Sequence, residues 1–118
     1  MKLAVNIVLS ASIAGLVEGT HFALKSGLDP EIFFRLILNG PLGNDIFVIK
    51  AKKIMEQDFT PQASIATVRE MLKHITDTAY EIDAFIPNTL SNVNLITAAM
   101  NRGLADEDAC AIIKVFGD

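Results

Sequence analysis

The first 26 residues, MKLAVNIVLSASIAGLVEGTHFALKS, constrain the fold most, because they form one long apolar segment. Its apolar residues lie nearly all the way round a helical projection, unlike those of a surface helix. A helix of this kind must be covered on several sides, by the rest of its own domain, by a second domain or by a partner subunit. The sequence therefore predicts a long helix from Lys2 to about Ser26, with Gly27 as its C-terminal cap.

Two other interpretations compete for this segment. Lys2 followed by the apolar run from Leu3 to Val17 has the outline of a signal peptide, and the protein would then be exported after removal of Met1 to about Ser12. Asn6 interrupts the run, however, and the pattern continues beyond it without an evident processing site. The run is also shorter than the roughly 20 apolar residues that cross a bilayer. We therefore expect neither a signal peptide nor a membrane span.

The composition limits the class of protein. At 118 residues the chain fits one domain, and its 51% hydrophobic and 20% charged residues exclude intrinsic disorder. A net charge of -4 and a pI near 5.0 lack the basic footprint that nucleic acids and anionic membranes require. Cys110 is the single cysteine, so the chain forms no internal disulfide and no cysteine-based metal cage. These properties fit a cytoplasmic protein with no nucleic-acid or membrane partner.

Start and stop signals divide the rest of the chain into further helices. The D-P-E triplet at residues 29–31 supplies an N-cap side chain, a proline in the first turn and a carboxylate at the positive end of the helix dipole. This helix should end at Asn39-Gly40. The next is expected from Asn44 to Met55, before a loop at residues 57–61, and its lysines are expected to face outward: Lys50, Lys52 and Lys53.

The second half of the chain predicts helices as well. From Ser64 to Ile82, apolar residues recur every three or four positions, which indicates a helix of about five turns. Another helix follows from Pro87 to Gly103, and a short last helix follows the acidic residues 106–108 and carries Lys114 near its end. No segment alternates between apolar and polar residues as a strand would. The predicted fold class is all-α, one domain of about six helices over residues 1–118.

Lys2 and Asn6 are the first candidate functional residues, since a spacing of four places them one turn apart on one helix face. Together they could hold a substrate hydroxyl or carboxylate, and a partly desolvated lysine there would serve as an acid or base. The structural alternative is a terminal lysine near a hydrogen-bonded core asparagine. The spacing alone favours this alternative.

Other chemical motifs are weak or missing from the sequence. His21 and His74 lie on different predicted helices and do not specify a metal site. The outward lysines and Arg69 could meet an anionic ligand, although such a cluster is normally a solvated face. The sequence contains no GxGxxG, GxxxxGK(S/T) or GxSxG motif, so it has no self-sufficient phosphate-binding loop or nucleophile elbow.

The stretches M-K-L-A-V-N, K-S-G-L-D-P and D-F-T-P together resemble the C-terminal helical domain of the β-hydroxyacid dehydrogenases. This family of the 6-phosphogluconate dehydrogenase superfamily includes 3-hydroxyisobutyrate dehydrogenase, and the likeness covers essentially the whole chain. In the family a Rossmann domain comes first, and the linking helix begins near a motif ending in K-x-x-x-N, which Lys2 and Asn6 match. The resemblance implies that Lys2 is the acid-base group at the substrate hydroxyl and that Asn6 helps to hold the substrate.

The chain departs from the family pattern after D-F-T-P. Family members usually carry a phenylalanine soon after this motif and then K-D-L in the next helix, where the lysine approaches the cofactor. Here Ala63 takes the aromatic position, and an ungapped count puts Glu70-Met71 at Lys-Asp. A one-residue gap would instead align Arg69-Glu70, although the position of Pro87 supports the ungapped count. Arg69 and Glu70 are thus the candidate cofactor contacts, and an unusual substrate preference is expected.

The resemblance implies a helical substrate-binding and dimerisation domain, residues 1–118, of an oxidoreductase acting on a small β-hydroxyacid or semialdehyde. NAD or NADP would be bound mainly by a Rossmann domain that this chain lacks, so the chain alone should be inactive. The apolar first helix would pack between domains and in the interface of a homodimer or larger homo-oligomer. The alternative is a stand-alone, non-catalytic homodimeric interaction module in which Lys2 and Asn6 are incidental.

Overall fold

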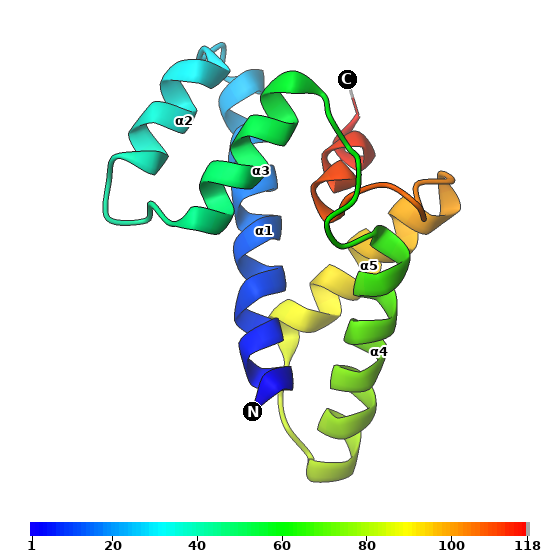
Figure 1. Ribbon diagram of the computed structural model, residues 1–118. Coiled ribbons are helices and arrows are strands. Elements are labelled where there is room, and N and C mark those ends of the chain that lie inside the picture. The colour runs from blue at the N-terminus through cyan, green and yellow to red at the C-terminus, as the bar shows by residue number, and fades with distance from the viewer. Residues whose placement is uncertain (118) are drawn as a thin grey trace.

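The computed structural model describes residues 1–117, which fold into six helices (Figure 1). α1 runs through the middle of the molecule, with α2 and α3 beside its C-terminal half and α4 and α5 on the other side. The described residues form no strand, only one isolated bridge between Ser64 and Asp108. The predicted all-α class is confirmed. In chain order the elements are α1 (Lys2–Lys25), α2 (Pro30–Leu38), α3 (Asp45–Glu56), α4 (Ile65–Ile82), α5 (Pro87–Asn101) and the 3-10 helix η1 (Ala109–Phe116).

Side-chain caps fix where four of the helices begin. The side chains of Asp29, Asn44 and Ser64 each accept a hydrogen bond from a backbone N–H of the first turn that follows, at 2.8, 2.9 and 3.1 Å. Asp108 caps η1 in the same way, at 3.0 Å. After α1, Gly27 has a φ of +85°, which glycine adopts without a steric penalty. The boundaries therefore agree with the sequence prediction to within about two residues.

The main core lies where α1, α4, α5 and η1 meet. A smaller cluster of Leu16, Phe34 and Ala51 joins α1 to α2 and α3. Most of the apolar stripe predicted for α4 is buried or half-buried, but Ile82, the last residue of the helix, is 67% exposed. The buried side chains of the main core are Ile13, Val17, Ile65, Leu72, Ile75, Ile96, Ala99, Leu104 and Ile112.

α1 is covered on only part of its circumference. Ile13 and Val17 are buried, whereas Val5, Val8 and Phe22 are 59%, 66% and 74% exposed. α1 has 24 residues and is long and apolar enough to cross a membrane, although its apolar residues do not form an uninterrupted run. No other helix among residues 1–117 meets this criterion. A core helix meets the same criterion. The chain thus buries one side of its longest helix and leaves much of another side apolar and open.

Candidate functional site

Lys2 and Asn6 lie one turn apart at the start of α1, as the sequence predicts. Lys2 is exposed and Asn6 is half-buried. Within residues 1–117 neither side chain has a hydrogen-bond partner, so Asn6 is not a hydrogen-bonded core residue. An ammonium and an amide are therefore presented together on one helix face, and both can donate hydrogen bonds to a hydroxyl, carbonyl or carboxylate oxygen.

The same face of α1 leads into a cavity of about 260 Å³. Leu9 and Ser10 follow Asn6 by one helical turn, Ile13 follows by two turns, and all three line the cavity. The opposite walls come from α4 and α5, and their apolar lining includes Val68, Met71, Leu72, Leu95 and Ile96. Lys2 and Asn6 themselves do not line the cavity, and Leu9, about one turn after Asn6, is the first residue of α1 that does.

Arg69 and Glu70, the candidate cofactor contacts, do not line this cavity. Both are exposed on α4 and border a separate hollow of about 380 Å³ between α4 and α5. Val68 and Met71, their neighbours on either side, do line the cavity, because successive helical residues point in different directions. The structure thus brings Lys2 and Asn6 together but leaves the Arg69 and Glu70 pair apart from them, and its role stays a prediction.

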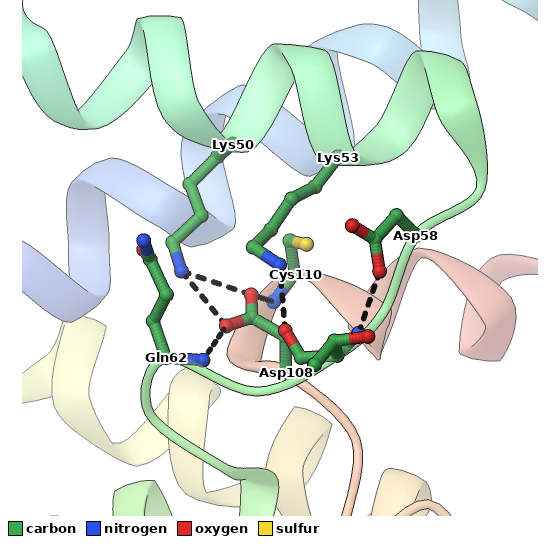
Figure 2. Close-up of polar contacts among 7 residues, drawn as sticks. Lys50, Lys53, Asp58, Gln62, Asp108 and Cys110 are labelled. Carbon is green, nitrogen blue, oxygen red and sulfur yellow. Dashed lines mark hydrogen bonds and ion pairs between the residues drawn. The ribbon is translucent and has the colours of Figure 1, made fainter.

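Lys50 corrects the sequence analysis, because it does not face outward (Figure 2). It is only 4% exposed, and its Nζ lies 3.0 Å from Oδ1 and 2.9 Å from Oδ2 of the fully buried Asp108. The reason is helical spacing: Phe47, Ala51 and Ile54 pack against the core, and Lys50 lies among them on the same face of α3. That apolar stripe was the signal that could have placed Lys50 inside.

Both carboxylate oxygens of Asp108 have hydrogen-bond partners. Besides the two contacts with Lys50, it accepts hydrogen bonds from the backbone N–H of Gln62 at 2.9 Å and of Cys110 at 3.0 Å (Figure 2). Burial alone would raise the pKa of Asp108, but the Cys110 N–H, the Lys50 ammonium and the Gln62 N–H outweigh it and lower the pKa to about 2. Asp108 thus joins α3, the loop before α4 and η1 at one point, which is a structural role.

The loop and thiol beside this ion pair are structural too. Asp58 of the D-F-T-P segment accepts a hydrogen bond from the N–H of Thr60 at 3.1 Å, and the carbonyl of Phe59 accepts one from the N–H of Asp108 at 2.8 Å. Burial, with the nearby Asp108 carboxylate, raises the pKa of the Cys110 thiol to about 12. The thiol is therefore protonated near neutral pH and is not a nucleophile.

The histidines stay apart in the fold. His21 packs against Phe116, with ring centroids 5.1 Å apart, and His74 is exposed on α4. Across residues 1–117 no three His, Cys, Asp or Glu side chains gather as a metal site would require. The chemistry available on the described surface therefore centres on Lys2, Asn6 and the apolar cavity.

Comparison with known proteins places this geometry in a family. Residues 1–116 match the sequence model described as "NAD-binding of NADP-dependent 3-hydroxyisobutyrate dehydrogenase". The chain belongs to this family. The resemblance drawn from the sequence is thereby confirmed, and the description of the family names the binding of NAD and an NADP-dependent dehydrogenase.

Several relatives match nearly the whole chain. The L-threonate dehydrogenase of Pectobacterium atrosepticum is 25% identical over 116 residues, which are 98% of this chain and 38% of that protein. The chloroplastic glyoxylate/succinic semialdehyde reductase 2 of Arabidopsis thaliana is 23% identical over 98% of this chain and 32% of its own length. The structure of 3-hydroxyisobutyrate dehydrogenase from Salmonella typhimurium has the same fold, with a TM-score of 0.92 at 23% identity over 98% of this chain and 40% of that one. The chain thus spans less than half the length of these relatives.

Proposed function

We propose that this chain is the helical substrate-binding and dimerisation domain of an NAD(P)-dependent β-hydroxyacid dehydrogenase, and that it acts together with a Rossmann domain. The observation that carries the proposal is the pair Lys2 and Asn6, presented without partners of their own at the start of α1 in a chain of this family. The sequence has no glycine-rich phosphate-binding loop, so the phosphates of the cofactor would be bound outside this chain. The chain alone is therefore expected to be inactive.

Lys2 would carry the proton in this reaction. The cofactor would supply the hydride acceptor for oxidation of the substrate alcohol, and the Lys2 amine would take up the hydroxyl proton, so that charge would not build up on the oxygen. In the reverse direction the Lys2 ammonium returns the proton to the carbonyl oxygen. Asn6, one turn further along α1, would donate a hydrogen bond that holds the substrate in place. Both side chains are available to a substrate, because they lie on one face of α1 with no hydrogen-bond partner among residues 1–117.

The open side of α1 supports a homodimer. Val5 and Val8 are exposed apolar side chains about one turn apart near the start of α1, and Phe22 is exposed near its end, and exposed apolar side chains of this kind favour an interface. A second copy of the chain would cover these side chains of α1. The helix would then be an interface helix and not a membrane span, as expected of a cytoplasmic protein. The net charge of -4 agrees with the absence of nucleic-acid partners.

A chimera tests the proposed activity. The matching segment of the Pectobacterium atrosepticum L-threonate dehydrogenase is replaced by this chain, and NAD- and NADP-dependent oxidation of L-threonate and other β-hydroxyacids is measured. We expect turnover, and we expect Lys2→Ala to lower kcat by about 10²- to 10⁴-fold, the usual contribution of a general acid or base. Lys52→Ala, at an exposed lysine of α3, is the matched control and should leave kcat unchanged.

Two results would count against the proposal. Equal kcat values for Lys2→Ala and Lys52→Ala would exclude Lys2 as the acid-base group. A folded, dimeric chimera with no turnover on any hydroxyacid would instead favour the stand-alone, non-catalytic interaction module.

A further inference from the structure

The cavity beside α1 is large for the interior of so small a domain. Its volume is about 260 Å³, whereas protein interiors hold few voids larger than a water molecule, and a 150 Å³ apolar cavity already binds benzene. Ile13, Leu72, Ile96 and Ile112 are buried around it, so its floor is apolar. A hollow of this size and chemistry has the properties of a binding site for an apolar group.

The rim shows where a ligand would enter. Gln62, Ala63 and Thr67 line the cavity and are exposed, and so is Ile46, which is 37% exposed on α3. Gln62 and Thr67 offer polar groups at this rim. The floor, as far as residues 1–117 form it, has no charged side chain without a partner. The opening thus admits a molecule with a polar end and an apolar end.

Among residues 1–117, Lys50 is the only charged side chain that lines the cavity, and its charge is already neutralised. Its Nζ contacts both carboxylate oxygens of Asp108 within 3.0 Å, and both partners are almost wholly buried. An anionic group in the cavity would therefore compete with Asp108 for Lys50 and would lose its own hydration. The part of a ligand that enters the cavity must be uncharged.

The cavity also lies in line with the proposed reaction centre. Leu9 lies three residues beyond Asn6, about 4.5 Å along the axis of α1, and Lys2 is a further turn away on the same face. A substrate whose hydroxyl reaches Lys2 can extend past Asn6 so that the end of its apolar tail lies against Leu9, the first residue of α1 that lines the cavity. The site would then bind the apolar part of the substrate beyond the helical turn that carries Asn6.

We propose that this cavity binds the alkyl or aryl substituent of the substrate, so that the chain prefers β-hydroxyacids with a medium-length apolar tail over those with three or four carbons. The proposal rests on the function proposed above, because it assumes that a hydroxyacid is held at Lys2 and Asn6. Ala63 at the rim and Met71 in the wall are the residues that set how long a tail is accepted, since a larger side chain at either position would fill the space.

Binding of two probes to the 118-residue chain tests the tail-binding role without any turnover. Isothermal titration compares 3-hydroxyoctanoate with 3-hydroxybutanoate, which lacks four methylenes, and methyl NMR follows Met71 and Ile96 in the cavity wall. Each buried methylene contributes roughly fourfold in affinity, so the longer acid should bind up to about 200-fold tighter and at least about 20-fold tighter. The Met71 methyl signal should shift with the longer acid only.

Variants separate the cavity from the apolar surface of α1. Ala63→Phe should reduce the preference for the longer acid to about threefold or less, and Met71→Trp should do the same from inside the cavity. Ala84→Phe adds the same ring at an exposed position outside the cavity and should leave the preference intact. Circular dichroism and thermal unfolding establish that each variant is folded, and two independent variants keep the test valid if one of them is not.

The results of these experiments distinguish the cavity proposal from the dehydrogenase proposal. Equal affinity for both acids, or tighter binding of the longer acid without a shift of Met71, would overturn the cavity proposal. Turnover in the chimera without any preference for 3-hydroxyoctanoate would overturn it as well, while leaving the dehydrogenase proposal in place. Loss of turnover in the chimera, with the Ala63-dependent binding preference intact, would refute the dehydrogenase proposal and support the cavity as a site for apolar carboxylic acids.

Discussion

Replacing Lys50 with methionine should destabilise the chain by about 3–5 kcal/mol, because it leaves the Asp108 carboxylate buried without its cation. Methionine keeps the length of the side chain, so little of the loss comes from packing. The pKa of Asp108 is about 2 in the folded chain against 3.8 for an ordinary carboxyl, and this difference corresponds to about 2.4 kcal/mol at neutral pH. Lys50 supplies only part of this difference, since the N–H groups of Cys110 and Gln62 lower the pKa as well, but its loss also leaves a buried charge without a cation.

Urea denaturation at pH 7 measures the effect as a change in midpoint at constant m-value. The matched control is Lys73→Met, since Lys73 contacts Asp77 at 2.8 Å but the two side chains are 68% and 60% exposed. An exposed pair of this kind contributes little to stability, because water and salt screen its charges, so Lys73→Met should be nearly neutral. The double variant Lys50→Met/Asp108→Asn should recover part of the loss, because no buried charge is then left unpaired.

The pH dependence gives an independent check. The pKa of Asp108 is lower in the folded than in the unfolded chain, so its contribution to stability is present above about pH 4 and is lost as the pH falls from there through about 2. In Lys50→Met the pKa of Asp108 should rise toward its ordinary value, and the loss of stability over this range should shrink. The reasoning is refuted if Lys50→Met costs no more than Lys73→Met, or if its acid profile matches that of the unchanged chain.

Two further predictions concern the thiol and the open side of α1. Because the pKa of Cys110 is about 12 against an ordinary 9.0, iodoacetamide at pH 8 should modify the folded chain roughly a thousandfold more slowly than the urea-unfolded chain; similar rates would show that the thiol is not held as described. Val8→Glu, at a 66% exposed position of α1, should convert a homodimer to monomer in sedimentation velocity. Tyr80→Glu, at an 86% exposed position of α4, is the control, and equal behaviour of the two variants would argue against an α1 interface.

The helices could be read from the sequence because their signals are local. Asp29, Asn44 and Ser64 each cap the helix that follows, through N–H groups two or three residues away. The resemblance that pointed to Lys2 and Asn6 is local too, since residues four apart on a helix share a face whatever packs around them. These parts of the prediction needed no knowledge of the rest of the chain.

The environment of Lys50 and the cavity could not be read in this way. The apolar stripe of α3 could indicate that Lys50 is buried, but its partner Asp108 lies 58 positions further along the chain, so the sequence gave no sign of the ion pair. The cavity is lined by residues of α1, α4, α5 and η1 that meet only after the helices pack. Neither property belongs to a single segment, so no periodicity or spacing in the sequence reports it.

The sequence by itself thus determined the all-α class, the helix limits and the pair of side chains on the first turns of α1, because each depends on contacts within a few residues. Only the tertiary structure decided that Lys50 pairs with Asp108, that Arg69 and Glu70 lie apart from Lys2, and that an apolar cavity begins at Leu9, one turn after Asn6. These depend on how the helices cross, and the free energy that fixes the crossings comes from burying apolar side chains that are distant in the chain.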